Sequence, residues 1–313
     1  MLSRRDFVNR MGATLATPAM LRLRRLAAGF SVSVITDEIT QDLGRACEIA
    51  ARDWGLGWVE LRSAHDKNIM SWEAADIAEA RRILERYNLR VSNLASPIFK
   101  CDWPGAPKSK FSPNAPQFGA DFTYGQQDEL LERVVSLAHA LQTPLVRVFD
   151  FWRLENQTSY RDAMDERLHQ GALKVKKDGI TLMAENEAAC NTATGAESGR
   201  LLGAVKEIGL TWDPGNARAA GETPYPDGYA KLPPRRIVHV HCKDAVLKAD
   251  GTTDWAAMGT GVIDWEGQFR ALRRDGFQGT LSLETHWRGA GSAEASSRQS
   301  MAGMKALLAK AES

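Results

Sequence analysis

The sequence predicts an α/β protein in which eight β-strands, each followed by a helix, close into a barrel within a single domain. Short β-branched runs alternate with longer segments whose apolar residues recur every three or four positions, the pattern of repeated βα units. Eight such units lie between residues 31 and 313, and a (β/α)8 TIM barrel typically takes about 250 residues. No glycine-rich phosphate loop follows the first run, so the barrel is preferred to the alternative, a doubly wound open sheet.

The predicted strands are short and apolar, and they lie at residues 31–36, 58–62, 89–95, 145–150, 180–185, 210–213, 236–241 and 280–284. The predicted amphipathic helices include residues 41–54, 72–87, 128–141, 164–177 and 265–276. Two longer loops, 97–124 and 217–234, follow the third and sixth strands. In a TIM barrel these loops lie on the face that carries the active site.

The first 30 residues carry a separate signal. Residues 3–8, SRRDFV, resemble the twin-arginine export motif and precede a mildly apolar stretch that arginines interrupt at positions 22, 24 and 25. We expect residues 1–30 to direct export to the periplasm and residues 31–313 to form the barrel. A basic N-terminal extension on a cytoplasmic protein is the alternative.

Composition favours a small-molecule partner. The chain has 40 Lys and Arg against 39 Asp and Glu, so its net charge of +1 provides no field for nucleic acid or an anionic membrane. After residue 30, no segment reaches the roughly 18 apolar residues that a membrane span needs, and we expect a soluble protein that is a monomer or a homo-oligomer. The four cysteines show no C-x-x-C spacing that would indicate a zinc knuckle.

Two histidines, His239 and His241, lie two positions apart in the seventh strand and therefore on the same face of it. Taken alone, such a pair favours hydrogen-bonded core histidines over a functional site. The neighbouring strands change this interpretation, because Glu185, Asp213 and Glu284 each close a strand at the same relative position as His241.

These four side chains would converge at one mouth of the barrel. Three carboxylates and one imidazole would repel one another unless a cation lay between them, so the pattern predicts a divalent metal site. Oxygen-rich ligation with one histidine favours Mn²⁺, Mg²⁺ or Co²⁺ over a structural zinc.

Seven segments together resemble the xylose-isomerase-like TIM barrels, a family that includes sugar phosphate isomerases, ketose 3-epimerases and inosose dehydratases. These segments are TDEITQD, GWVELRS, LMAENE, LTWDPGNA, HVHCKDA, GTGVIDW and LSLETHW, and the resemblance extends from residue 31 to about residue 308. It implies that the metal ligands are Glu185, Asp213, His241 and Glu284. His239 would be a structural companion one layer deeper.

The resemblance also implies the chemistry. In this family a metal ion binds vicinal oxygens of a hydroxy-ketone, and carboxylates remove and return the proton between them. Glu185 and Glu284 would be this acid/base pair in a sugar isomerase or epimerase. The predicted substrate contacts are Glu60, Asn93, Lys100, Arg147, Asn216 and Lys243.

Other side chains carry weaker expectations. Asp244 would orient the metal ligand, form a solvated salt bridge or bind substrate hydroxyls. Phe99 and Trp103, on the loop after the third strand, would stack on a sugar or cover the barrel rim.

Three alternatives remain at this point. The segment HCKDAVLK lacks the substrate-binding arginine of the ketose epimerases. Its absence points towards a keto-sugar or keto-glycoside as the substrate. The enzyme would then be a lyase or hydratase that acts by β-elimination or its reverse. A sugar-binding barrel without activity would need a lost ligand position, and none is lost. The DNA-repair endonucleases of this fold hold three metal ions with several more histidines. The total of six histidines and the near-neutral net charge of this chain argue against that alternative.

Overall fold

The computed structural model describes residues 29–113 and 120–313. The predicted export motif at residues 3–8 lies outside the described residues. Within them, none of the helices is both long enough and apolar enough to cross a membrane.

The described residues form an eight-stranded parallel barrel, which confirms the predicted fold class. Its strands, in chain order, are β1 (Ser31–Val34), β2 (Trp58–Leu61), β5 (Arg90–Ala95), β6 (Leu145–Val148), β7 (Thr181–Glu185), β8 (Gly209–Trp212), β9 (Ile237–Cys242) and β12 (Thr280–Leu283). They pair in the order β1-β12-β9-β8-β7-β6-β5-β2, and a parallel bridge between Ile35 and Glu60 links the two ends of this sheet. Each strand begins within one residue of its predicted start and ends within two residues of its predicted end.

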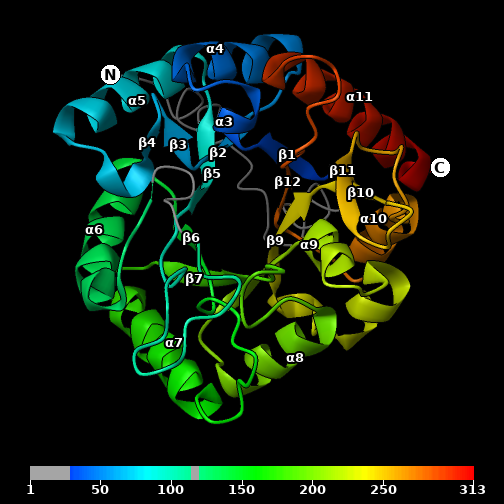
Figure 1. Cartoon of the computed structure of the whole chain (residues 1–313). Helices are drawn as coiled ribbons and strands as arrows, with labels where there is room; N and C mark the ends of the chain where they lie inside the picture. Colours follow the sequence, from blue (N-terminus) through cyan, green and yellow to red (C-terminus); the bar gives the residue numbers. More distant parts are fainter. Residues whose placement is uncertain (1–28, 114–119) are drawn as a thin grey trace, which may run out of the picture. The chain divides into compact units, whose positions relative to one another are not determined.

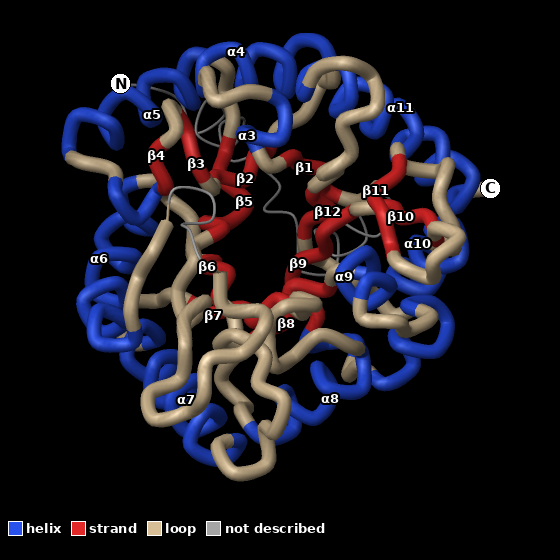
Figure 2. The backbone as a smooth tube through the Cα atoms, viewed as in Figure 1, coloured by secondary structure: helices blue, strands red, loops and turns tan. Residues whose placement is uncertain are grey.

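The helices lie around the ring of strands, as Figures 1 and 2 show. They are α3 (Thr36–Ile39), α4 (Leu43–Glu48), α5 (Ala74–Arg86), α6 (Gln127–Ala140), α7 (Arg161–Lys176), α8 (Gly195–Ala204), α9 (Pro214–Ala219), α10 (Trp265–Arg274) and α11 (Ala293–Glu312). Helix α10 shows how local sequence sets a boundary. The Asp264 carboxylate accepts a hydrogen bond from the Gly267 amide at the first turn, and two arginines occupy the last turn.

Short strands and helical turns lie in the loops at the carboxyl ends of the barrel strands. Two antiparallel hairpins, β3–β4 (Ser63–Ala64 with Lys67–Asn68) and β10–β11 (Asp244–Leu247 with Thr253–Ala256), follow β2 and β9 and were not predicted. The segment 217–234, expected to be a loop, instead contains the end of α9 and two short helical turns, Pro224–Gly228 and Tyr229–Lys231. Asp213 supplies the cap that starts α9, because its carboxylate accepts from the Asn216 amide at 2.9 Å.

Candidate metal and catalytic centre

The barrel register brings the four predicted ligands to one mouth of the barrel. In the parallel ladders Glu185 is paired with Thr211, and Thr211 is paired with His239. His241 and Asp213 each lie two residues further along β9 and β8, so they reach the same mouth of the barrel. On the other side of β9, the Glu284 amide donates to the Cys242 carbonyl at 3.1 Å, which places Glu284 beside this group.

The ring nitrogen Nδ1 of His241 is the centre of this group. It lies 3.0 Å from Glu185 Oε1, 3.3 Å from Glu284 Oε2 and 3.9 Å from Asp213 Oδ2. One donor atom from each of these four buried residues lies within 4.8 Å of the other three. The structure therefore brings together the whole set that the sequence singled out.

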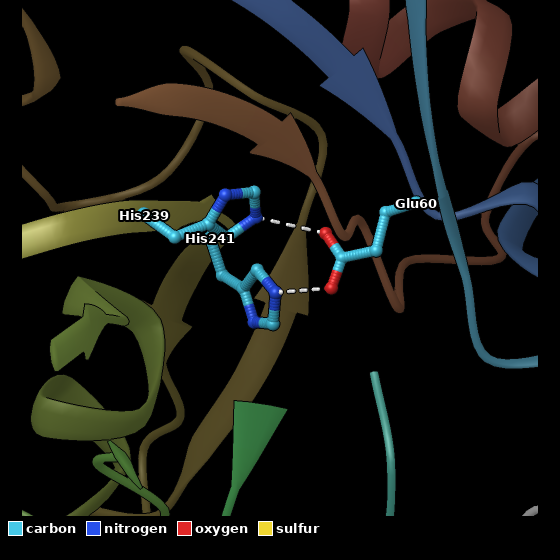
Figure 3. Close-up of side chains that lie close together, drawn as sticks. All are labelled: Glu60, His239 and His241. Atoms are coloured by element: carbon cyan, nitrogen blue, oxygen red, sulfur yellow. Dashed lines mark hydrogen bonds and ion pairs between the residues drawn. The ribbon is translucent and has the colours of Figure 1, made fainter. Parts of the chain in front are cut away.

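The opposite ring nitrogen of His241 contacts Glu60. His241 Nε2 lies 3.0 Å from Glu60 Oε1, and His239 Nε2 lies 2.9 Å from Glu60 Oε2, so one carboxylate bridges both rings (Figure 3). All three side chains are fully buried. A carboxylate that accepts the Nε2 proton leaves Nδ1 with its lone pair facing the other carboxylates, which is the arrangement of a histidine that ligates a metal.

One lysine and two arginine side chains also contact the candidate carboxylate ligands. Lys243 Nζ lies 2.8 Å from both Asp213 Oδ2 and Glu284 Oε2, and Arg62 Nη1 donates to Glu284 Oε1 at 2.8 Å. Arg147 Nη1 donates to Glu185 Oε2 at 2.5 Å. Arg62 and Arg147 thus hold the outer oxygens of Glu284 and Glu185, which restricts where these carboxylates can turn. Lys243 instead contacts the same oxygens of Asp213 and Glu284 that face His241 Nδ1.

These neighbouring groups shift the pKa values of the three candidate carboxylate ligands in different directions. Burial raises the pKa of Glu185, but His241 and Arg147 outweigh it and lower that pKa to about 2. For Glu284, Lys243 and the histidines likewise overcome burial and hold its pKa well below the usual value. Burial and the charges of the other two carboxylates raise the pKa of Asp213 to about 7, although Lys243 opposes the shift.

A narrow cleft of about 30 Å³ opens onto this centre, lined by residues that include Glu185, Glu284, Lys243, Arg147 and Lys100. Three of the six predicted substrate contacts, Lys100, Arg147 and Lys243, are therefore on its wall. At about 10–15 Å³ per water, the cleft has room for two or three waters, or for the edge of a larger molecule.

The other three predicted contacts, Glu60, Asn93 and Asn216, are not among the residues that line the cleft, and their role as substrate contacts stays a prediction. Glu60 holds the two histidines, and Asn93 Nδ2 lies 3.0 Å from His239 Nε2. Asn216 Nδ2 donates to Glu185 Oε1 at 3.1 Å and to the Asn186 carbonyl at 3.0 Å. These side chains support the candidate ligands from within the barrel.

Asp244 and Phe99 differ from their expected roles. The Asp244 carboxylate accepts hydrogen bonds from the backbone amides of Ala245, Gly259 and Gly261, so it organises the loop before α10. Phe99 is fully buried, and its ring centroid lies 5.5 Å from that of Phe151. Trp103 packs edge-on against Phe151 and Tyr124.

Several site residues were not singled out from the sequence. Arg62, Glu187 and His286 line the cleft, and Glu38 and Trp255 contact that lining. All except Trp255 lie inside the quoted motifs: TDEITQD contains Glu38, GWVELRS contains Arg62, LMAENE contains Glu187 and LSLETHW contains His286. Each of these four residues lies one to four positions after the end of a barrel strand, which was the available signal.

The donor set fits a divalent ion. Three carboxylate oxygens and an imidazole nitrogen are ligands that Mn²⁺ and Mg²⁺ accept. Among the described residues, the ion pairs around the cleft involve seven carboxylates and five Lys and Arg side chains. The net charge of this group is therefore −2 when the imidazoles are neutral. The carboxylates are Asp37, Glu38, Glu60, Glu185, Glu187, Asp213 and Glu284, and the cations are Arg62, Lys100, Arg147, Lys243 and Arg288.

Comparison with known proteins agrees with this fold. A family model described as "xylose isomerase-like TIM barrel" matches residues 49–307. No curated protein matches the sequence significantly.

Solved structures share the fold at low identity. The probable 3-DHS dehydratase AsbF of Bacillus anthracis matches with a TM-score of 0.66 and 17% identity, over 88% of this chain and 98% of that one. A D-tagatose 3-epimerase-like protein matches at 0.63 and 18% identity, over 91% and 98%. A xylose isomerase-like TIM barrel/4-hydroxyphenylpyruvate dioxygenase fusion protein matches at 0.66 and 18% identity over 89% of this chain, which spans only 42% of the fusion.

Proposed function

The chain belongs to the xylose isomerase-like TIM barrel family, and from this premise we propose that it is a divalent-metal-dependent sugar isomerase or epimerase. It would remove and return a proton at the carbon next to the carbonyl of a keto-sugar. The observation that carries the proposal is the group around His241 Nδ1, in which Glu185 and Glu284 both lie close to this nitrogen and both line the cleft.

Glu185, Asp213, His241 and Glu284 would hold the ion. A bound divalent cation would polarise the substrate carbonyl and so lower the pKa of the adjacent C–H group. The excess of two negative charges among the described side chains supports one such ion, with His241 neutral and Glu60 accepting its Nε2 proton.

Glu185 and Glu284 would carry the proton. The low pKa of each means that both are ionised at neutral pH and able to accept a proton from carbon once substrate is bound. Two carboxylates on opposite sides of one carbon would invert its configuration, because one removes the proton and the other returns it. One carboxylate moving a proton between adjacent carbons would isomerise the sugar instead.

A lyase is the second candidate, because the cleft also holds the Lys100 ammonium group, which is paired with a carboxylate other than Glu185 and Glu284. Lys100 Nζ lies 3.1 Å from Glu187 Oε2 on the cleft wall. An ammonium there can protonate an oxygen that leaves from the carbon beside the carbanion. The reaction would then be β-elimination from a 3-keto-glycoside, giving an enone and the free alcohol.

The test is metal analysis of the purified protein, followed by incubation with free ketoses and 3-keto-glucosides in D₂O with added Mn²⁺. We expect one divalent ion per chain and NMR-detected deuterium at the carbon next to the carbonyl. A new epimer or isomer indicates the first candidate, and an enone or its hydrate indicates the second. Metal binding without any exchange would instead indicate a sugar-binding barrel, and a protein that binds no metal would contradict the proposal.

A further inference from the structure

A second hollow adjoins the reaction cleft on the side of the loop that follows β5. It measures about 420 Å³, within the range of about 300–1,000 Å³ of small-molecule pockets, and is far larger than the cleft. The two cavities share Pro97 and Lys100 in their walls. These two residues therefore lie between the two cavities.

The wall of this hollow combines aromatic rings with polar groups. Phe122, Tyr124 and Trp152 supply the rings. Tyr124 is held in place because the Trp103 ring packs edge-on against it at 5.3 Å between centroids and Phe151 lies 6.1 Å away. Aromatic rings offer flat apolar faces that bury large area.

The charges on the same wall balance. The wall carries two carboxylates, Asp102 and Asp121, and two ammonium groups, Lys100 and Lys108, so neither sign dominates, although Lys100 is also paired with Glu187 of the cleft. A ligand that offers an apolar face to rings and hydroxyl groups to charged side chains, while carrying no charge itself, is a sugar ring.

Lys100 is fixed between the two cavities. Its ammonium pairs with Glu187 and lies 4.4 Å from the centre of the Phe149 ring and 5.2 Å from that of Trp152. The reacting carboxylates Glu185 and Glu284 line only the cleft. A group bound in the hollow is therefore separated from the reacting carbon by Lys100.

We propose that this hollow is a second sugar subsite and that the substrate is a two-ring keto-glycoside. The hydroxy-ketone edge of one ring enters the cleft, the second ring packs against Phe122 and Tyr124, and the glycosidic oxygen between the rings lies beside Lys100. The inference rests on the proposed function for the reacting ring, and it adds the substrate class.

The experiment compares a 3-keto-disaccharide of two glucose units with the methyl 3-keto-glucoside, using kcat/KM for deuterium exchange in the metal-loaded full chain. We expect the parent to prefer the two-ring substrate by about tenfold or more, as one well-placed aromatic contact of about 1.4 kcal/mol provides. Tyr124→Ala and, separately, Phe122→Ala should reduce this preference. Tyr87→Ala, an aromatic change at the end of α5, is the matched control and should leave the ratio unchanged.

Direct binding separates the two proposals. The unoxidised disaccharide, which cannot react, should show saturation-transfer NMR signals from its protons with the parent and weaker signals with Tyr124→Ala, while circular dichroism verifies folding. Equal kcat/KM for one-ring and two-ring substrates would overturn the subsite even if exchange occurs and the proposed function holds. Disaccharide binding that depends on Tyr124, without exchange on either substrate, would support the subsite and contradict the proposed function.

Discussion

The carboxylate of Glu60 joins His239 and His241 by contacts of 2.9 and 3.0 Å to their Nε2 atoms, and the three side chains are fully buried (Figure 3). Two imidazoles on one strand face are thus oriented by a single anion from a strand on the other side of the barrel. Burial opposes ionisation of Glu60, but both histidines lower its pKa well below the usual value. Glu60 therefore stays ionised and can accept a hydrogen bond from each Nε2–H group, which would leave Nδ1 of His241 free to ligate a metal ion.

Replacing Glu60 with glutamine should weaken the metal site. The amide oxygen can accept only where one carboxylate oxygen did, so one imidazole loses its partner and His241 loses a fixed orientation. We expect Glu60→Gln to reduce Mn²⁺ affinity about 10–100-fold, measured by calorimetry. Glu207→Gln is the matched control, because Glu207 contacts His169 at 2.7 Å on the surface, and it should leave the affinity unchanged. Equal affinities for both variants would contradict the role given to Glu60.

Glu284→Gln separates proton transfer from metal binding. The amide keeps the shape and one oxygen ligand but cannot accept a proton, so metal should still bind, more weakly. Proton exchange at saturating Mn²⁺ should fall by about 10²–10⁴, as for loss of a general acid/base group. His241→Ala should fail instead by losing the ion, and excess Mn²⁺ should restore part of its activity. Exchange at the parent rate in metal-saturated Glu284→Gln would move the base to Glu185 or Lys243.

Lys243→Met tests the ammonium group inside the carboxylate cluster. Without metal, Asp213 and Glu284 would lose their shared cation, which costs about 3–5 kcal/mol for a buried pair. Saturating Mn²⁺ should raise the melting temperature of this variant more than that of the parent, because the ion replaces the missing charge. Lys248→Met removes an exposed pair with Asp254 and should cost about 0–1 kcal/mol. Equal Mn²⁺-induced shifts in the Lys243 variant and the parent would contradict this expectation.

Metal binding should release protons. Without metal, burial lowers the pKa of His241, but Glu60, Glu185 and Glu284 outweigh it and raise that pKa well above 6.5, while the pKa of Asp213 is raised to about 7. A ligating imidazole must be neutral and a ligating carboxylate ionised, so both groups lose protons on binding, and affinity should rise from pH 6 to pH 8. Calorimetry in buffers of different ionisation enthalpy measures the release. An affinity that does not change with pH would show that neither group ligates.

Export is a proposal about residues 1–30. Fused to a folded reporter, this segment should deliver it to the periplasm by the twin-arginine route, and Arg4→Lys with Arg5→Lys should stop delivery. Cell fractionation measures the outcome. A reporter that stays in the cytoplasm in both cases would leave the segment as an N-terminal extension.

The sequence alone located the strands and the set of ligands that converges. Each strand is an apolar, β-branched run closed by a polar residue, and both features are local, so LMAE, LTWD and LSLE predicted where Glu185, Asp213 and Glu284 lie along the chain. Because parallel strands end at one mouth of a barrel, their convergence also followed from the fold class. The catalytic and ligand roles of these residues remain predictions.

Only the tertiary structure decided which inward side chains face the cleft and which lie beneath it. Period-2 alternation says that Glu60 and Asn93 point inward, but their depth depends on how each strand is staggered against its neighbours when the barrel closes. Glu60 and His241 are 181 positions apart in the sequence, and no local pattern encodes their contact. The contacts of Lys243 with Asp213 and Glu284 depend on the same closure of the barrel. The side chain of Lys243 is flexible, so the strand register determines which carboxylates lie within its range.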